Sequence, residues 1–233
     1  MTAQLHIEDK QIVVPGQVLA TGLEYLPSKG TYRTNEEIRA NKLGLVQVDG
    51  KVLKTISLSG RYLPKKGDTI VGRVSDVLMS GWRIDLNTMV DSVLSLKEAT
   101  NEYIKRGEDL TRYFALDDWV SAKVTQVTSQ NLVDVSMRGP GLQKLEGGTI
   151  IEVDSQKVPR IIGARGSMVR MLKKGTECEI MIGQNGIIWL QGEPQMEVVA
   201  IKAIRLIEDN SHLPGLTEEI KNFLTEITGN EVE

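Results

Sequence analysis

The pattern of hydrophobic and polar positions changes several times between residues 146 and 210, and each change predicts an element. Residues 148–154 alternate as in a strand. After a short apolar stretch and a Gly-x-x-Gly turn, Met168 and Leu172 lie on one face of a helix that Ser167 can cap. The pattern therefore predicts a strand followed by two helices that a glycine-containing turn connects.

A hairpin and a third helix complete this segment. Alternating runs at 178–182 and 188–190 flank Gly183-Gln184-Asn185-Gly186, in which Asn-Gly supplies the positive φ angles of a tight turn. Gly183, Asn185 and Gly186 are therefore predicted to be structural turn residues. Pro194 then begins a helix whose apolar face continues to Ile207.

Short alternating runs dominate the preceding stretch, residues 63–141, and a small linker helix separates the third run from the fourth. Each run is bounded by turn residues such as Gly67 and Gly81. Five short strands fit a small OB-type barrel. The runs are residues 69–78, 81–86, 89–94, 118–127 and 132–138.

The two ends of the chain differ from these segments. Residues 44–48 and 52–58 are predicted strands around the Asp49-Gly50 turn, and the polar stretch 29–42 is expected to form a flexible loop or short helix. This β module carries no ligand motif, which favours a scaffold or docking surface. Residues 216–227 have the spacing of a packed amphipathic helix that Thr217 can cap, and nothing argues for order after Gly229.

The chain is therefore predicted to be a multidomain protein, mainly β with one α+β part. The divisions are a β docking domain at 1–62, a barrel at 63–141, an α+β domain at 146–210, and a helix with a tail at 211–233.

Composition limits the chemistry. A formal charge of −3 with 40% hydrophobic residues is ordinary for a globular protein, and no apolar run approaches the ~20 residues of a membrane span. We expect a cytoplasmic protein without a membrane partner. Cys178 is the only cysteine and is expected to be a buried thiol, and His6 and His212 each stand alone, so no zinc-ligand spacing exists. Neither a catalytic group nor a metal or other cofactor is expected.

Residues 157–174 carry the clearest functional signal. They contain six basic residues and no acidic one, around the turn Gly163-Ala164-Arg165-Gly166. Two glycines allow a backbone to approach a phosphodiester closely, and the arginine adds positive potential. The residues predicted here to bind nucleic acid are Arg160, Gly163, Ala164, Arg165, Gly166 and Arg170. A simple helix connector is the alternative, but it would not need three arginines.

The order of elements in residues 146–210, with this turn, resembles a type I KH domain. The resemblance implies that the Gly163–Gly166 loop grips single-stranded RNA.

The barrel segment resembles an S1 domain, an OB-type fold that binds single-stranded RNA. Gly67-Asp68, Gly81, Ile84-Asp85-Leu86 and 135–138 carry this likeness. S1 domains usually expose aromatic residues where this chain has Ser80 and Arg83, and Trp82 is expected to lie in the core. Phosphate attraction should therefore exceed base stacking. The residues expected to supply it are Arg83, Arg112, Lys123 and Arg138.

The whole order of modules resembles the RNA-binding cap subunit of the archaeal exosome, the Rrp-four family. Further support comes from Val13-Val14-Pro15-Gly16, the run 157–163, and Gly183-Gln184-Asn185-Gly186 followed by Trp189. The resemblance implies a non-catalytic subunit that docks through its amino-terminal module to a hexameric ring of two RNase PH-like subunits. A trimeric cap of this subunit, or of it with a related cap subunit, would feed RNA 3′ ends to phosphorolytic 3′–5′ degradation, with a preference for poly(A).

Other functions stay open from the residues alone. A free-standing RNA-binding, transcription or translation factor could combine S1 and KH modules, although an elongation factor would carry a second KH module and polynucleotide phosphorylase has the reverse order. A nuclease would need a carboxylate cluster. Asp85, Asp91, Asp117 and Asp118 are the candidates, and they are better interpreted as solvated turn and strand-edge residues.

Overall fold

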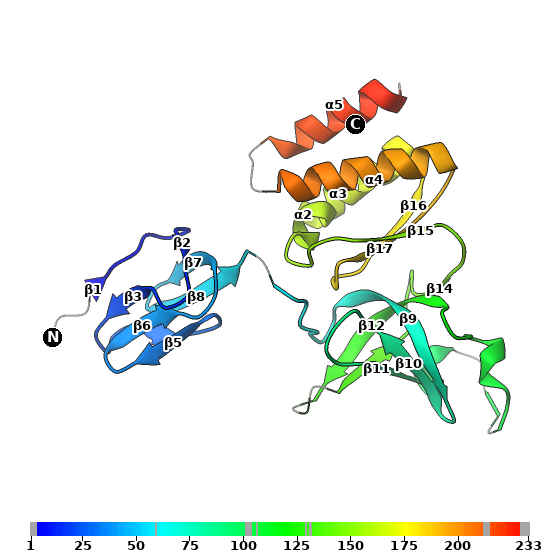
Figure 1. Cartoon of the computed structure of the whole chain (residues 1–233), viewed down its shortest axis with the longest axis horizontal. Helices are drawn as coiled ribbons and strands as arrows, with labels where there is room; N and C mark the ends of the chain where they lie inside the picture. The colour runs from blue at the N-terminus through cyan, green and yellow to red at the C-terminus, as the bar shows by residue number, and fades with distance from the viewer. Residues whose placement is uncertain are drawn as a thin grey trace. The chain divides into compact units, whose positions relative to one another are not determined.

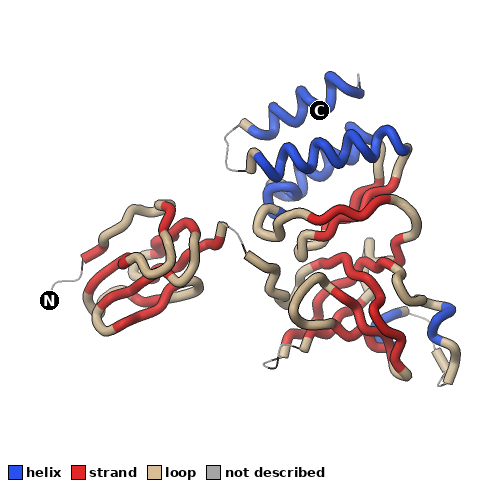
Figure 2. The backbone as a smooth tube through the Cα atoms, viewed as in Figure 1, coloured by secondary structure: helices blue, strands red, loops and turns tan. Residues whose placement is uncertain are grey.

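A computed structural model of the chain describes residues 4–58, 60–100, 104–105, 107–128, 130, 132–211 and 215–228. The chain forms two compact units, Met1–Gly60 and Arg61–Glu233 (Figures 1 and 2). The expectations for His212 and for the tail after Gly229 lie outside the described residues. The finer domain boundaries given by the sequence pattern stay predictions.

The first unit is built from two sheets around one core. In the described residues the strand orders are β1-β3-β6-β5 and β2-β7-β8-β4. Leu19, Ile38, Val46 and Leu53 are completely buried in this core. The strands are β1 Gln4–Leu5, β2 Ile12–Val13, β3 Val18–Thr21, β4 Leu26–Pro27, β5 Thr31–Thr34, β6 Glu37–Ala40, β7 Gly44–Asp49 and β8 Val52–Ser57.

The expectation of a loop or short helix at residues 29–42 is wrong, because β5 and β6 form an antiparallel hairpin there. Asn35 has φ 54° in the turn between them. The side chains of β6 alternate, and only Ile38 and Ala40 reach the core. Two apolar residues among many polar ones are a weak strand signal. The predicted hairpin around Asp49-Gly50 is confirmed, since β7 and β8 pair along their full length.

The predicted five-stranded barrel is confirmed in the second unit. Its strand order is β13-β11-β10-β9-β12, and an additional pairing of β12 with β13 closes it. A short strand, β14, pairs antiparallel with the start of β12. The elements are β9 Thr69–Leu78, β10 Gly81–Asp85, β11 Ser92–Ser95, α1 Leu96–Ala99, the 3₁₀ turn η1 Leu110–Arg112, β12 Trp119–Val127, β13 Val133–Ser136 and β14 Lys144–Leu145.

Trp82 lies in the barrel core, as predicted, with 0% of its surface exposed. Its indole Nε1 donates to the Phe114 carbonyl oxygen at 3.0 Å, and the two rings meet edge to face at a centroid distance of 5.1 Å. A buried indole with a satisfied N–H is a packing residue, so Trp82 is not available to stack on a base.

The KH-like order is also confirmed. A three-stranded antiparallel sheet, β15-β17-β16, carries the helices on one face (Figure 1). The core includes Ile161, Leu172, Ile188 and Ile204. The elements are β15 Thr149–Glu152, α2 Val158–Ile162, the 3₁₀ turn η2 Ala164–Gly166, α3 Ser167–Thr176, β16 Glu179–Ile182, β17 Ile187–Gln191 and α4 Pro194–Asp209.

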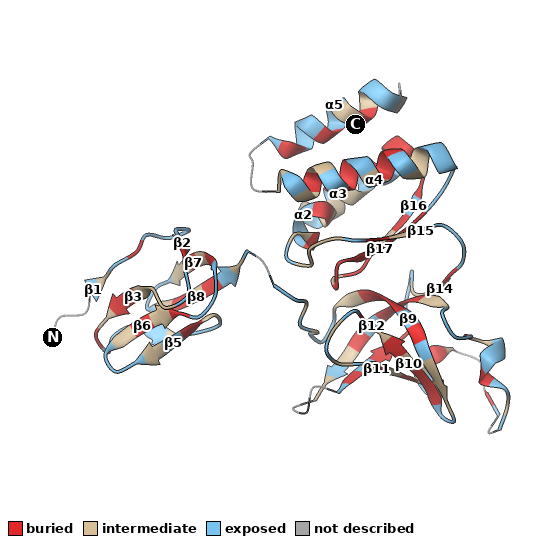
Figure 3. Ribbon diagram, viewed as in Figure 1, coloured by how far each residue is buried: buried red, intermediate tan, exposed pale blue. Residues whose placement is uncertain are grey.

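The last described helix, α5 Leu216–Thr228, packs on α3 and α4. Leu216, Ile220 and Leu224 are buried, which confirms the predicted amphipathic helix (Figure 3). Thr217 is not its cap, because the helix begins one residue earlier. The Gly215 carbonyl oxygen accepts the first bond, from Glu218 N at 3.0 Å.

The turn between β16 and β17 joins the barrel to the KH-like domain. The Asn185 side chain is 7% exposed, and its Nδ2 donates to the carbonyl oxygens of Val71 at 2.7 Å and Leu86 at 3.1 Å, while its Oδ1 accepts from Val71 N at 3.3 Å. Next to it, Gln184 N donates to Thr69 O at 2.8 Å. Val71, Leu145, Ile187 and Trp189 form an apolar cluster at the same junction.

The predicted turn chemistry needs a correction at Asn185. Gly186 has φ 87°, but Asn185 does not adopt a positive φ. The asparagine is needed for its amide, which binds the barrel. Gly183 serves the same contact, because a Cβ there would lie 2.7 Å from Val71 N.

Replacing Asn185 by alanine should lower the free energy of unfolding by about 1–3 kcal/mol, because buried peptide groups of Val71 and Leu86 lose their partners. Asn185→Asp should cost at least as much, since a carboxylate would face two carbonyl oxygens. Urea unfolding of both variants is the measurement, with exposed Gln191→Ala as the control. Variants as stable as wild type would show that the amide does not hold the two parts together.

Candidate nucleic-acid interface

The loop between α2 and α3 has an unusual backbone. Three of its four residues have positive φ: Gly163 at 73°, Arg165 at 53° and Gly166 at 76°. A Cβ at Gly163 would lie 2.7 Å from Met168 N, so the loop packs tightly on the start of α3. Such φ values are uncommon for a residue other than glycine. The fold thus holds Arg165 in a strained conformation with its side chain exposed.

The start of α3 faces this loop. Ser167 was expected to cap the helix but is its first residue, and Gly166 occupies the cap position without a side-chain hydrogen bond. The loop backbone bends through Gly166 before the helix begins, which moves the cap one residue toward the amino terminus. Ser167 N donates to the Ala164 carbonyl oxygen, and the remaining first-turn N–H groups, which no side chain caps, keep their positive potential toward the loop.

Exposed cations surround the loop. Arg165 and Arg170 are exposed, and neither has an ion-pair partner among the described residues. The same holds for Lys173 and Lys174, which follow Arg170 on the same face of α3. The sequence analysis did not single out these two lysines, although their i+3 and i+4 spacing from Arg170 was visible. Arg160 instead donates from Nε to Ser211 O at 2.9 Å.

The four barrel cations predicted to bind RNA do not form one group. Arg83 is held between Asp76 at 3.7 Å and Asp91 at 3.6 Å. Arg138 donates from Nε and Nη2 to the Thr100 carbonyl oxygen at 3.3 and 3.1 Å. Arg112, at the end of η1, and Lys123, on β12, are exposed.

Arg83 and Lys123 also lie toward different ends of β9. In register, Arg83 is opposite Asp76 and Lys123 is opposite Thr69. At about 3.3 Å per residue these two positions on β9 are roughly 20 Å apart. The carboxylates beside Arg83 reduce the local positive potential, so Arg165 is the stronger candidate for phosphate contact.

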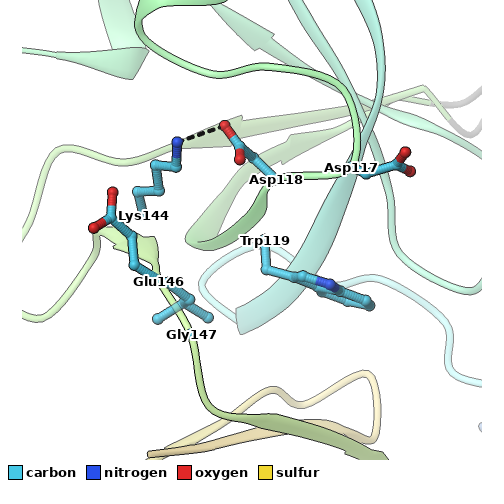
Figure 4. Close-up of a pocket in the computed structure, with 7 residues that line it drawn as sticks. Asp117, Asp118, Trp119, Lys144, Glu146 and Gly147 are labelled. Atoms are coloured by element: carbon cyan, nitrogen blue, oxygen red, sulfur yellow. Dashed lines mark ion pairs between the residues drawn. The ribbon is translucent and has the colours of Figure 1, made fainter.

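The carboxylates weighed as metal ligands have other partners. Asp117 pairs with Arg73 at 3.4 Å, and Asp118 pairs with Lys144 at 2.7 Å. Figure 4 shows the second pair beside Trp119 and Glu146 in an open pocket of about 390 Å³. Asp117, Leu145 and Gly147 complete its lining.

The other two carboxylates are also engaged within the fold. Asp85 accepts from Asn87 N at 2.8 Å, and Asp91 pairs with Arg83. No group of three or more potential metal ligands occurs in the described part of the chain. The thiol of Cys178 is buried, and this burial raises its pKa, so it is a packing group and a poor nucleophile. None of the described helices is both long and apolar enough to cross a membrane.

Three family models match consecutive parts of the chain. The N-terminal region of "Exosome complex exonuclease RRP4" matches residues 12–49, the "RRP4, S1 domain" matches 61–126, and a "KH domain" matches 148–196.

Curated relatives are similar over nearly the whole chain. The exosome complex component Rrp4 of Methanothermobacter thermautotrophicus is 37% identical over 98% of this chain and 72% of its own length. Rrp4 of Methanopyrus kandleri is 38% identical over 97% of this chain and 98% of its own length. A solved crystal structure of a candidate exosome complex RNA-binding protein has a TM-score of 0.64 and 30% identity, covering 72% of this chain and 97% of that one.

Arg165→Glu should weaken binding of single-stranded RNA by roughly 10- to 100-fold for different sequences alike, because a lost charged hydrogen bond costs about 1.5–3 kcal/mol. The logarithmic dependence of affinity on salt should flatten by roughly 0.7 for one lost phosphate contact. Fluorescence anisotropy at several salt concentrations measures both quantities.

Arg83→Gln is the comparison variant and should change the affinity much less, because two aspartates already neutralise Arg83. A larger loss for Arg83→Gln than for Arg165→Glu would place the main RNA contact on the barrel.

Proposed function

Because the chain belongs to the Rrp4 family of exosome complex components, we propose that it is the non-catalytic RNA-binding cap subunit of such a complex. Three copies would cap a hexameric ring of two RNase PH-like subunits, in the cytoplasm, and would pass RNA 3′ ends to phosphorolytic sites in the ring. The observation that carries the RNA-binding role is the Gly163–Gly166 loop, with its close-packed Gly163 and its exposed Arg165, which has no ion-pair partner among the described residues.

In this proposal the loop contacts the phosphate backbone of the RNA. Gly163 lets the loop pack on α3, the small residues Ala164 and Gly166 leave room for the RNA strand, and Arg165 and Arg170 supply charge. Residues 157–174 contain no aromatic side chain, and Trp82 is buried. Binding should therefore tolerate many sequences, and the poly(A) preference stays an inference from the family. Arg160, Arg112, Lys123 and Arg138 are proposed as secondary contacts, with Arg83 the weakest.

A docking surface for the ring is available on the first unit. Ile12, Leu45 and Ile56 are paired in register across β2, β7 and β8, and Ile12 and Ile56 are 61% and 52% exposed. Val14, Leu43 and Leu58, also exposed, continue this face. We call these six residues the apolar stripe. Contiguous exposed apolar residues favour a protein partner, and the family match makes the ring our choice.

Ile12→Asp combined with Ile56→Asp should abolish association with a reconstituted ring while leaving RNA affinity unchanged, because a buried unpaired charge opposes docking. Leu23→Asp is a matched control, since Leu23 is 73% exposed on the same unit and lies outside the stripe. Co-elution in size-exclusion chromatography reports the outcome. If the double variant still co-elutes with the ring, another surface docks.

The purified protein should bind labelled single-stranded RNA and leave it intact with phosphate and magnesium. The reason is that the candidate carboxylates are engaged in ion pairs or turn hydrogen bonds. Gel electrophoresis over several hours is the measurement. Cleavage that Asp85→Ala abolishes would contradict the non-catalytic assignment, whereas cleavage that persists in this variant points to a contaminating nuclease.

A further inference from the structure

A second group of cations lies on the barrel, and two of its three members, Lys65 and Lys66, are outside the residues assigned to RNA above. Lys65 and Lys66 occupy the turn before β9, in which Asp68 N donates to Lys65 O at 3.1 Å. Both lysines are exposed. Neither ammonium group has a carboxylate partner among the residues that the structure describes.

Lys123 lies beside this turn. It is opposite Thr69 in the β9–β12 register. The next residue, Val124, accepts a hydrogen bond from Gly67 N at 2.8 Å and donates one to Asp68 O at 2.9 Å. Neighbouring strands are about 5 Å apart, so the turn and Lys123 are adjacent. We call Lys65, Lys66 and Lys123 the lysine cluster.

Backbone contacts connect the lysine cluster to the Gly163–Gly166 loop. Gln184 N donates to Thr69 O at 2.8 Å, which brings the β16–β17 turn against the start of β9. Val153 N then donates to Gly186 O at 2.8 Å. From there a turn at residues 154–157, in which Lys157 N donates to Asp154 O at 2.9 Å, leads into α2, which spans only about 8 Å before the loop. The cluster and the loop are therefore joined through one hairpin turn.

The charge along this path is positive. Four carboxylates of the described residues lie near it, and each accepts a hydrogen bond within the fold: Asp68 from the Tyr62 hydroxyl at 2.8 Å, Glu152 from Asn87 Nδ2 at 3.2 Å, Asp154 from Gln156 N at 2.9 Å, and Glu208 from Asp154 N at 2.8 Å. These bonds spread their charge. The cations along the path are more numerous: Lys65, Lys66, Lys123, Lys157, Arg160 and Arg165.

We infer that the lysine cluster is a second phosphate-binding site for the RNA strand that the Gly163–Gly166 loop holds. The strand would run from the loop, past the Asn185 turn, to the barrel. The inference rests on the proposed RNA-binding function. A KH-type loop holds about four nucleotides, and an OB-type surface adds about 4–16. A strand of about 12 nucleotides could therefore reach both sites, whereas one of about four could not.

Lys65→Gln combined with Lys66→Gln tests this inference. For an RNA of about 12 nucleotides the affinity should fall roughly tenfold, and the salt dependence should flatten by about 1.4 for two lost contacts. An RNA of about four nucleotides should bind as it does to wild type. Lys97→Gln with Lys105→Gln removes the same charge from two exposed positions near α1 and should leave both affinities unchanged.

The outcomes separate the two proposals. If the double variant and the control bind the long RNA equally well, the lysine cluster does not contact RNA, while the proposed function stands provided that Arg165→Glu weakens binding. If the double variant loses the same affinity for the long and the short RNA, the inference is also wrong, because the lysine cluster would then not be a second site beyond the loop. If the double variant binds RNA normally but no longer binds a protein partner, the lysine cluster is a contact for that protein. Wild-type protein that binds neither RNA would refute both proposals.

Discussion

The buried amide of Asn185 sets the geometry on which the RNA-binding surface depends. It satisfies peptide groups of Val71 and Leu86 in the barrel from a turn of the KH-like domain. The apolar cluster around Trp189 contributes attraction without direction, whereas hydrogen bonds to three fixed backbone atoms permit one arrangement. Any other orientation would leave buried peptide groups unpaired, at about 1–3 kcal/mol each. This contact between the turn and the barrel therefore positions the cations of the two domains relative to each other.

A fixed spacing between these cations matters because the protein as a whole is acidic, so only local groups of cations can attract a polyanion such as RNA. The formal charge of the chain is −3, but exposed charges separated by more than about 8 Å are screened at physiological salt. How strongly each cation attracts RNA then depends on the charges immediately around it. Arg83 has two aspartates beside it, whereas Arg165 has no carboxylate partner among the described residues. An RNA strand that is held at one of these sites meets the next site at a high effective concentration.

Local signals predicted most of the fold, and non-local contacts account for the errors. Pro194, the apolar period of α4 and the alternation of β9 and β12 are properties of neighbouring residues, so their elements were predicted correctly. The hairpin at 31–40 was missed because its stability comes from burying Ile38 and Ala40 against distant strands. Asn-Gly indicated a turn, but only the fold brings Val71 and Leu86 to the amide. In the same way the sequence identifies Arg83 as a cation and cannot show that Asp76 and Asp91 neutralise it.

The proposed functions of the two units require different interactions. A subunit that stays on a ring while RNA passes needs a durable contact with one partner and a transient contact with the other. Burial of the apolar stripe depends little on salt or on the direction of approach, which suits permanent docking. Phosphate contacts tolerate any base and release as counterions compete, so a strand can advance from one cation to the next. Exposed aromatic residues along the path would bind each base more tightly and slow that movement, and the barrel instead buries Trp82 in its core.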